Sequence, residues 1–311
     1  MYCSLWMKGF KDESSKKNKL LLKKKILSEA FSYHSQGNLV AAEKKYRYFL
    51  DQGFNDPRVY TNYAILFKET SREEEALRLL NISISRYPNN PEPLAITSDI
   101  LRRQGKLFDA KVYIEKAIII KPNDANFHFN LGIIFIGLKI LSKAVISLNK
   151  ALIINPNFLE AHLNLCSVHI SLCDLNEAER CGKKVISLDP NCSKAHFDLS
   201  RIYFELGRED EAELSVRKAL SINPKYPEAY NNLGLILKSL DKPVEAEIST
   251  RKAIELKNDY VEAYYNLSNI LRYIGKTEES IECSKIIMKI RPWSIIGSFS
   301  LNQNFEIKLS S

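Results

Sequence analysis

The sequence predicts an all-α protein, a solenoid of about eight tandem repeats in which each repeat is a helix, a turn and a second helix. Prolines spaced 34 residues apart, small side chains at two fixed positions of this period and glycines at a third support the prediction. One proline set follows a 34-residue lattice, with Asn258 at its single missing point, and comprises Pro88, Pro122, Pro156, Pro190, Pro224 and Pro292. A second set lies three residues after lattice points and comprises Pro57, Pro91 and Pro227. Because proline is tolerated in the first turn of a helix and just beyond a helix end, the two sets mark where one helix stops and the next begins.

Two positions of the period hold only small side chains. Phasing on the prolines gives an array over 23–294, with repeats at 23–56, 57–90, 91–124, 125–158, 159–192, 193–226, 227–260 and 261–294. The eighth position reads Ala30, Ala64, Ser98, Gly132, Cys166, Ser200, Gly234 and Ser268, and the twentieth reads Ala42, Ala76, Ala110, Ala144, Ala178, Ala212, Ala246 and Ser280. Antiparallel helices approach closely only where no long side chain intervenes. We therefore expect the first helix of each repeat, helix A, to cross the second, helix B, at these two positions.

The turn between the helices of a repeat and the two chain ends complete the predicted organisation. Gly37, Gly105, Gly207 and Gly275 share the fifteenth position, where a helix end favours a left-handed residue. Residues 1–22 precede the repeats and are predicted to be a disordered basic tail. Residues 295–311 form a C-terminal tail whose apolar residues alternate at period two, unlike an amphipathic capping helix.

The formal charge of +8 is concentrated in the N-terminal tail. Residues 1–25 contain eight lysines and two acidic residues, whereas the rest of the chain has 37 basic and 35 acidic residues. A nucleic-acid groove normally shows basic residues clustered on one face of the folded domain. We therefore expect no strong nucleic-acid binding, although a lysine-rich tail can make weak contact with an anionic surface.

Composition also excludes membrane and secreted classes. The most apolar window, 131–138, is stopped by Lys139, far short of the roughly 18 residues that a transmembrane helix needs. The N-terminus has no basic residue ahead of an apolar patch and no small-residue cleavage site, so a secretory signal is not expected. Six cysteines in 311 residues are too few for a disulfide scaffold. We predict a cytoplasmic protein.

One set of side chains has the spacing of a metal site. His162, Cys166, His169 and Cys173 lie on one face of one predicted helix, with Cys181 and Cys192 nearby, which is compatible with zinc. The same positions hold aromatic, small, aromatic and turn residues in other repeats, and four residues over three helical turns cannot all reach one ion. We favour structural histidines and buried cysteines, and predict no metal, no cofactor and no catalytic residue.

The two-helix period of 34 residues, with its small eighth and twentieth positions, closely resembles the tetratricopeptide repeat (TPR). This resemblance implies a right-handed superhelical solenoid whose A helices line a concave face where ligands bind. The segments MKGF and FSYHSQGNLVAAEKKYRYFL also resemble the openings of cyanobacterial TPR proteins. Some members of that group continue into a glycosyltransferase-like or other group-transfer domain, for which this chain is too short.

The sixth position of the A helices carries a repeated amide. It reads Asn62, Ile96, Asn130, Asn164, Asp198, Asn232 and Asn266. Asparagine is a mediocre helix former, and stacked A helices would align these side chains into a ladder. The ladder resembles that in the repeat array of O-linked N-acetylglucosamine transferase, which implies amides that bind the backbone of an extended peptide. The alternative is that repeat duplication preserved an asparagine whose role is structural.

Positions five, nine and twelve flank the amide ladder. In the central repeats they are apolar: Phe129, Ile133, Ile136, Leu163, Ile170, Phe197 and Phe204. In the outer repeats they are polar or charged, and the residues predicted to form a rim include Arg102 and Arg272. An apolar patch with a polar rim is typical of a binding surface, although tighter packing between central helices would select the same residues.

These features predict a non-enzymatic scaffold for protein–protein interaction, which binds an extended peptide or protein partner in the groove formed by the A helices. The alternative is the recognition module of a glycosyltransferase-like or other group-transfer enzyme whose catalytic domain is missing or separate. The charged clamp with which some TPR proteins hold a C-terminal carboxylate cannot be assembled from consecutive repeats here, so chaperone-tail binding is disfavoured.

Overall fold

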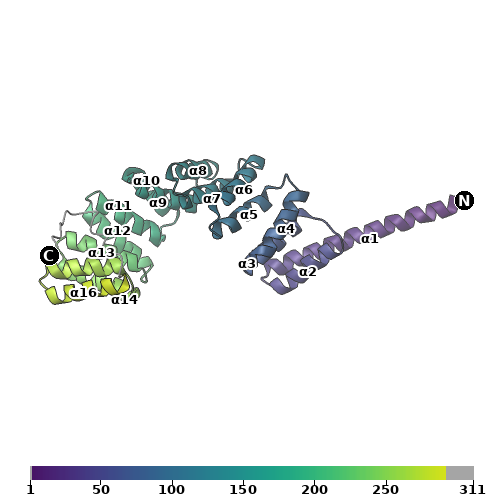
Figure 1. Cartoon of the computed structure of the whole chain (residues 1–311). Helices are drawn as coiled ribbons and strands as arrows, with labels where there is room; N and C mark the ends of the chain where they lie inside the picture. Colours follow the sequence, from purple (N-terminus) through teal and green to yellow (C-terminus); the bar gives the residue numbers. More distant parts are fainter. Residues whose placement is uncertain (1, 292–311) are drawn as a thin grey trace, which may run out of the picture. The chain divides into compact units, whose positions relative to one another are not determined.

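The computed structural model describes the backbone of residues 2–291 and the side chains of residues 18–291, and this part of the chain contains sixteen α-helices and no strand (Figure 1). The A helices are α1 Tyr2–Ser35, α3 Pro57–Glu69, α5 Pro91–Arg103, α7 Ala125–Gly137, α9 Leu159–Ser171, α11 Ser193–Glu205, α13 Pro227–Ser239 and α15 Val261–Tyr273. The B helices are α2 Leu39–Asp51, α4 Glu73–Arg86, α6 Leu107–Ile120, α8 Leu141–Ile154, α10 Leu175–Leu188, α12 Glu209–Ile222, α14 Pro243–Leu256 and α16 Thr277–Ile290. The predicted all-α repeat solenoid is confirmed, and the C-terminal tail lies outside the described residues.

Each A helix from α3 onward begins at the first residue of a repeat as phased on the prolines. Three of these starts are capped by the preceding side chain. Asp56, Asn90 and Asp124 each accept a hydrogen bond from the backbone N–H two residues later. This bond satisfies one of the amide groups that a helix start leaves unpaired. The period of the sequence therefore positions the helices through local backbone chemistry.

The turn between helices A and B has a residue in the left-handed backbone conformation at the same position in all eight repeats. Gly37, Gly105, Gly207 and Gly275 adopt positive φ as predicted, and so do Ser71, Lys139, Cys173 and Asp241, with φ between 53° and 81°. Around Lys139 the backbone closes the end of α7 in the same way as around Gly105, since each residue donates its N–H to the carbonyl three residues earlier. The turn geometry is thus set by the repeat and imposed on non-glycine residues.

The helices of each repeat cross at the small side chains, and all sixteen are buried. In three repeats the eighth residue donates to the backbone carbonyl of position twenty on helix B: Ser98 Oγ lies 2.7 Å from Ala110 O, Cys166 Sγ 3.4 Å from Ala178 O and Ser268 Oγ 3.2 Å from Ser280 O. Ser200 instead donates to Phe197 O within its own helix, at 2.7 Å. Where the eighth residue is glycine, a larger side chain does not fit, because a Cβ on Gly132 would lie 2.8 Å from the Leu148 side chain. The predicted crossing point is therefore the closest contact within the repeat.

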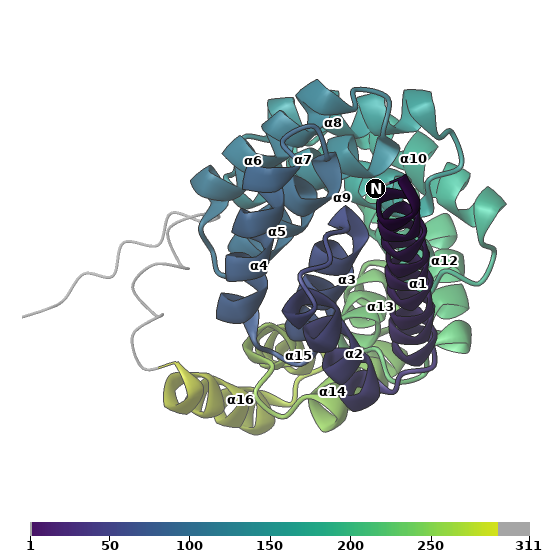
Figure 2. The same cartoon turned by 90° about the vertical axis from the view of Figure 1, so that its right-hand side faces the viewer.

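The chain divides into two compact units, unit 1 from Met1 to Pro156 and unit 2 from Asn157 to Ser311. Within each unit, every A helix packs on its own B helix and also contacts the A helix of the next repeat. Figure 2 shows this neighbour packing for α14, α15 and α16 at the end of unit 2. The units are described separately below.

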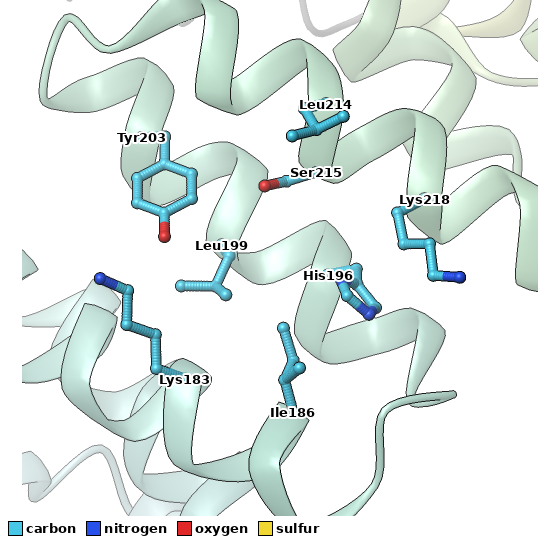
Figure 3. A pocket seen from close by; sticks show the side chains of 8 residues that line it. All are labelled: Lys183, Ile186, His196, Leu199, Tyr203, Leu214, Ser215 and Lys218. Carbon is cyan, nitrogen blue, oxygen red and sulfur yellow. The ribbon is translucent and has the colours of Figure 1, made fainter.

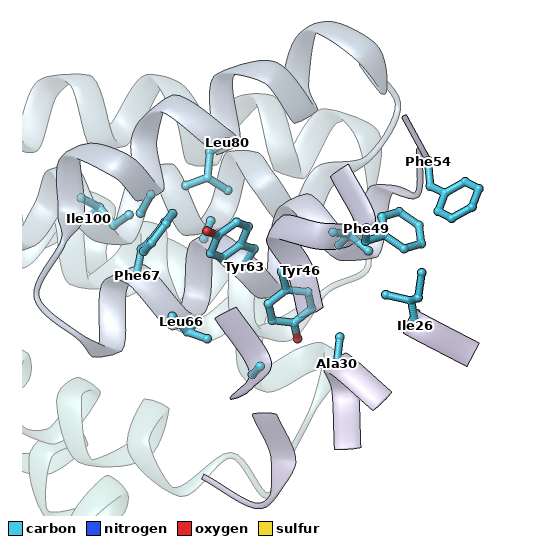
Figure 4. Packing of buried hydrophobic residues seen from close by; sticks show 14 residues of the cluster. Ile26, Ala30, Tyr46, Phe49, Phe54, Tyr63, Leu66, Phe67, Leu80 and Ile100 are labelled. Atoms are coloured by element: carbon cyan, nitrogen blue, oxygen red, sulfur yellow. The ribbon is translucent and has the colours of Figure 1, made fainter. Parts of the chain in front are cut away.

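Unit 1 has an aromatic core at its N-terminal end (Figure 4). The rings of Tyr46 and Tyr63 stack with centroids 5.4 Å apart, and the ring of Phe67 lies 4.4 Å from that of Tyr63. Phe49 and Phe54 extend the cluster toward α1, where Lys19 Nζ lies 5.8 Å from the centre of the Phe54 ring. These large rings fill the space that aliphatic residues fill in other repeats.

The segment predicted to be a disordered tail differs from that expectation. In the structure residues 2–22 belong to α1, which extends beyond the end of α2 as one helix (Figure 1). Lysine and leucine, abundant here, both have high helix propensity, so the segment continues the first repeat helix. Lys23 Nζ donates to Asn55 O at 2.8 Å and anchors the helix where the repeat begins. Among the described helices, none combines the length and the apolar character needed to cross a membrane.

Ion pairs join successive B helices at a fixed register. A basic residue at the sixteenth position reaches the glutamate at the twenty-first position of the preceding repeat, at 2.8–2.9 Å, in the pairs Arg72–Glu43, Arg208–Glu179, Lys242–Glu213 and Lys276–Glu247. The hydrogen bond from Lys242 holds the pKa of Glu213 below its usual value. Three of the four pairs lie in unit 2, whose B helices are therefore bound together partly by charge.

The left-handed turn generates a stability prediction. Replacing Lys139 with glycine should increase the free energy of unfolding by about 0.5–1 kcal/mol, because glycine has no steric cost at positive φ. Replacing Gly105 with alanine, the matched change in the opposite direction, should decrease it by about 1 kcal/mol. Urea denaturation followed by circular dichroism measures both. A destabilised Lys139→Gly variant would contradict the shared turn geometry.

Candidate peptide-binding surface

The predicted site residues lie on one side of the A helices, which we call the A-helix face: positions five, six, nine and twelve of each A helix. Two contacts show that these positions face each other on neighbouring helices. Lys68 Nζ lies 3.0 Å from Asp99 Oδ2 between α3 and α5, and Asn266 Nδ2 donates to Asn231 Oδ1 at 2.9 Å between α15 and α13. The predicted residues divide between the units. Unit 1 holds Asn62, Arg102, Phe129, Asn130, Ile133 and Ile136, and unit 2 holds Leu163, Asn164, Ile170, Phe197, Asp198, Phe204, Asn232, Asn266 and Arg272.

The apolar members of the face are neither fully buried nor fully exposed. All seven are half-buried, namely Phe129, Ile133, Ile136, Leu163, Ile170, Phe197 and Phe204. The hydrophobic cores of both units consist of other residues, such as Ile134 and Leu165, which are almost completely buried. The apolar side chains of the face therefore keep surface that a partner can cover.

Sequence reasoning missed an aromatic and a cationic neighbour of Phe197. The Tyr226 ring lies 4.9 Å from that of Phe197, and the Arg201 guanidinium lies 5.9 Å from the centre of the Phe197 ring. Burial raises the pKa of Tyr226 to about 12, so its hydroxyl stays protonated at neutral pH. The sequence contained a pattern that could have identified Tyr226, because tyrosine occupies the last position of two successive repeats, at Tyr226 and Tyr260.

The amides of the sixth position are used in two different ways. Asn62 and Asn164 each donate to the backbone carbonyl four residues earlier, Arg58 O at 2.8 Å and Glu160 O at 2.7 Å. Each of these bonds stays within one helix and uses one of the two amide N–H hydrogens, while the side chains remain partly exposed. In unit 1, Asn130 is also half-buried. These three residues keep amide groups within reach of a ligand.

Two members of the ladder differ from the expectation of a solvent-facing row. Asn232 is only 9% exposed, and its Nδ2 donates to Ser200 Oγ at 2.8 Å, which joins α13 to α11. Asp198 is 1% exposed and pairs with Lys194, whose Nζ lies 3.0 Å from Oδ2. Both side chains are committed to packing between repeats, so we no longer place them in contact with a ligand.

Asp198 carries a charge where the other repeats hold an amide or Ile96. Burial raises the pKa of its carboxyl, and the nearby positive charges of Lys194 and Arg201 only partly oppose this effect. A raised pKa means that folding favours the protonated form. The ionised carboxylate is therefore a cost to the folded state at neutral pH.

The histidines and cysteines of the A helices and turns, including His128 and His196 outside the predicted metal set, have different structural roles. His128 and His196, at the fourth position, place Nε2 2.8 Å and 3.0 Å from the carbonyl oxygens of Pro122 and Pro190, in the turn before the helix. Burial raises the pKa of the Cys166 thiol to about 12, which disfavours the thiolate that metal binding needs. Cys173 is exposed in the left-handed turn. Within the described residues, no group of three or more His, Cys, Asp or Glu side chains is arranged to hold a metal ion.

Two cavities of unit 2 lie away from the predicted surface. One, of about 440 Å³, is lined by residues of α10, α11 and α12, with Leu199 and Ile186 between Lys183 and Lys218 (Figure 3). The other, of about 410 Å³, involves α14, α15 and α16 at the same repeat positions. Because the register is identical, we attribute both cavities to the way in which successive helix pairs stack.

Comparisons with known proteins agree with this architecture. A family model described as TPR repeat matches residues 200–241, and one described as Tetratricopeptide repeat matches residues 227–260 and 261–292. These matches identify tetratricopeptide repeats within residues 200–292. A search of curated proteins gives no match.

Several solved structures share the fold. A tetratricopeptide repeat protein from Parabacteroides merdae has a TM-score of 0.58 at 18% identity, covering 80% of this chain and 98% of that chain. The APC/C hetero-tetramer Cut9–Hcn1 gives 0.61 at 16% identity, covering 90% and 55%. YrrB, described as a TPR protein with an unusual peptide-binding site, gives 0.52 at 19% identity, covering 59% and 95%. At these identities the likeness establishes the fold.

The two uses of the amide predict different mutational costs. Asn232→Ala should lower the free energy of unfolding by about 1–2 kcal/mol, because it removes a buried hydrogen bond to Ser200. Asn164→Ala should change it by less than about 0.5 kcal/mol, because alanine suits a helix and the lost bond is local. Urea denaturation of both variants tests the distinction. Equal costs would show that the ladder has one role throughout.

The buried carboxylate predicts a gain in stability. Asp198→Asn should raise the free energy of unfolding by roughly 1 kcal/mol near neutral pH, because a neutral amide removes a desolvated charge and Lys194 is half exposed to water. The gain should disappear as the pH falls below about 4, where the aspartate is protonated in both states. Denaturation at several pH values measures this difference. A variant that is less stable at neutral pH would show that the Lys194 pair outweighs the burial cost.

Proposed function

We propose that this protein is a non-enzymatic scaffold that binds an extended peptide, or an extended segment of a protein partner, along the A-helix face of one unit. The observation that supports this most directly is the row of half-buried apolar side chains on that face, which includes Phe197 and Phe204 in α11. Their remaining surface lies outside the cores that hold the helices together. A ligand that covers this surface gains roughly 25 cal/mol for each Å² of apolar area buried.

Amides beside the apolar row would hold the backbone of the peptide. Asn164, on α9, keeps its side-chain oxygen as an acceptor while its N–H₂ group has a second hydrogen to donate. An extended strand presents N–H and C=O groups at regular intervals, and an amide can pair with either. YrrB, which shares this fold, is a TPR protein described as having an unusual peptide-binding site, which supports a peptide as the ligand.

The alternative function predicted from the sequence is a recognition module of a group-transfer enzyme. It applies if the protein partner is itself such an enzyme. The scaffold function and the A-helix face are the same in both cases. The cytoplasmic location and the weak anionic contact of the N-terminal lysines remain predictions from composition.

The proposed function predicts that A-helix-face variants lose partner binding. A photo-crosslinking amino acid at position 164 should capture a partner in native cells, and the captured segment can be mapped by mass spectrometry. Phe197→Ser together with Phe204→Ser should reduce the capture at least tenfold, because about 1.4 kcal/mol of lost apolar contact corresponds to a factor of ten in affinity.

Leu214→Ser is the matched control, since Leu214 is 73% exposed on α12, outside the A-helix face. This variant should capture the same segment at the level of the unmodified protein. Loss of capture in the control alone, or equal capture by both variants with unchanged melting, would contradict a peptide site on the A-helix face.

A further inference from the structure

One charge arrangement occurs twice on the A-helix face, at the same repeat positions. In unit 1, Lys68 at position twelve of α3 and Arg102 at position twelve of α5 both contact Asp99 at position nine of α5, at 3.0 Å and 2.7 Å. Burial alone would raise the pKa of Asp99, but hydrogen bonds from Arg102 and Lys68 hold it below its usual value. The aspartate is therefore ionised and neutralises its neighbours.

In unit 2 the same three positions carry Lys238, Asn269 and Arg272, on the contacting helices α13 and α15. The two cations are kept, but the carboxylate is replaced by an amide. The Arg272 guanidinium lies 3.4 Å from Asn269 Oδ1, the limit of a hydrogen bond. Neither Lys238 nor Arg272 has a carboxylate within 4.0 Å among the described residues. The two cations at these repeat positions therefore lack the anion that unit 1 supplies.

The surrounding charged residues do not neutralise the positive charge of Lys238 and Arg272. Arg201, at position nine of α11, contacts the Phe197 ring and has no ion pair within the described part of the chain. Asp241, three residues after Lys238, accepts a hydrogen bond from the Tyr273 hydroxyl at 2.8 Å. Glu205, one turn after Arg201, lies beyond ion-pair distance of it, and Lys276 is paired with Glu247. Carboxylates are therefore present nearby, but none of them forms an ion pair with Lys238 or Arg272.

We propose that Lys238 and Arg272 bind an acidic side chain, aspartate or glutamate, of the extended peptide, and that this acidic residue takes the place that Asp99 occupies in unit 1. The inference rests on the proposed function and adds the chemistry of the partner. A planar guanidinium can hold a carboxylate through two parallel hydrogen bonds, and Lys238 adds a second charge. Arg201 adds a third cation of unit 2 beside the apolar side chain of Phe197, so a segment in which acidic residues lie near large apolar ones fits the face.

Synthetic peptides test the inference on the full-length protein. Three fluorescein-labelled extended peptides share one scaffold containing phenylalanines and carry three glutamates, three glutamines or three lysines at the same positions. Fluorescence anisotropy should give at least tenfold tighter binding of the glutamate peptide than of the glutamine peptide, and this difference should shrink with added salt.

Asn269→Asp is the decisive variant because it rebuilds the unit 1 arrangement in unit 2. It should remove the preference for glutamate and leave the affinity for the glutamine peptide unchanged. Arg272→Gln should reduce the same preference by about tenfold. Arg78→Gln is the control, because Arg78 is an exposed cation on α4 outside the A-helix face, and it should keep the preference. Circular dichroism and melting check that each variant is folded.

The outcomes separate the two proposals. Equal binding of glutamate and glutamine peptides, weakened for both by Phe197→Ser with Phe204→Ser, overturns the acidic site and leaves the peptide scaffold standing. A glutamate preference that survives in Asn269→Asp also overturns the acidic site. Binding of none of the three peptides contradicts the scaffold proposal and the acidic site together.

Discussion

The close crossing of helices A and B is the constraint on which the rest of the structure depends. Where Gly132 meets Leu148 there is no room for a methyl group, and Ser98 bonds directly to the backbone of α6. A crossing this tight fixes the angle and the rotation of the two helices of a repeat. Once the pair is fixed, each A helix presents the same four positions to one side. The A-helix face is thus a consequence of the smallest side chains in the repeat.

Equivalent positions nevertheless have different roles, and the sixth position illustrates why. The amide of Asn164 bonds within its own helix, whereas that of Asn232 reaches Ser200 on the preceding A helix. The difference follows from the neighbour: a small hydroxyl at position eight of α11 leaves space and supplies an acceptor. In a solenoid, residues contact both their own repeat and a neighbouring repeat. A residue type that recurs at one repeat position can therefore have a different contact partner in each repeat.

Charge on the A-helix face follows the same logic. Asp99 accepts contacts from two repeats at once, and its replacement by an amide at Asn269 changes the electrostatics of a surface without altering the fold. Ion pairs between B helices, such as Lys242 with Glu213, stabilise the stack on the other side of the repeat. The two sets of charges are separated by the helix pair, which allows the A-helix face to vary while the stacking contacts are kept.

The sequence by itself determined the repeat period, the helix starts and the crossing points, because these depend on local backbone preferences and on side-chain size. It also placed Phe197 and its companions on one side of the A helices, since helical periodicity decides which side a residue takes. Only the tertiary structure decided that Asp198 and Asn232 are buried, that Tyr226 stacks on Phe197 and that Lys139 adopts a left-handed turn. The contacts of Asn232 with Ser200 and of Tyr226 with Phe197 join residues about 30 positions apart, which a single repeat does not contain. The turn at Lys139 is closed by hydrogen bonds within its own repeat, but lysine has no intrinsic preference for it.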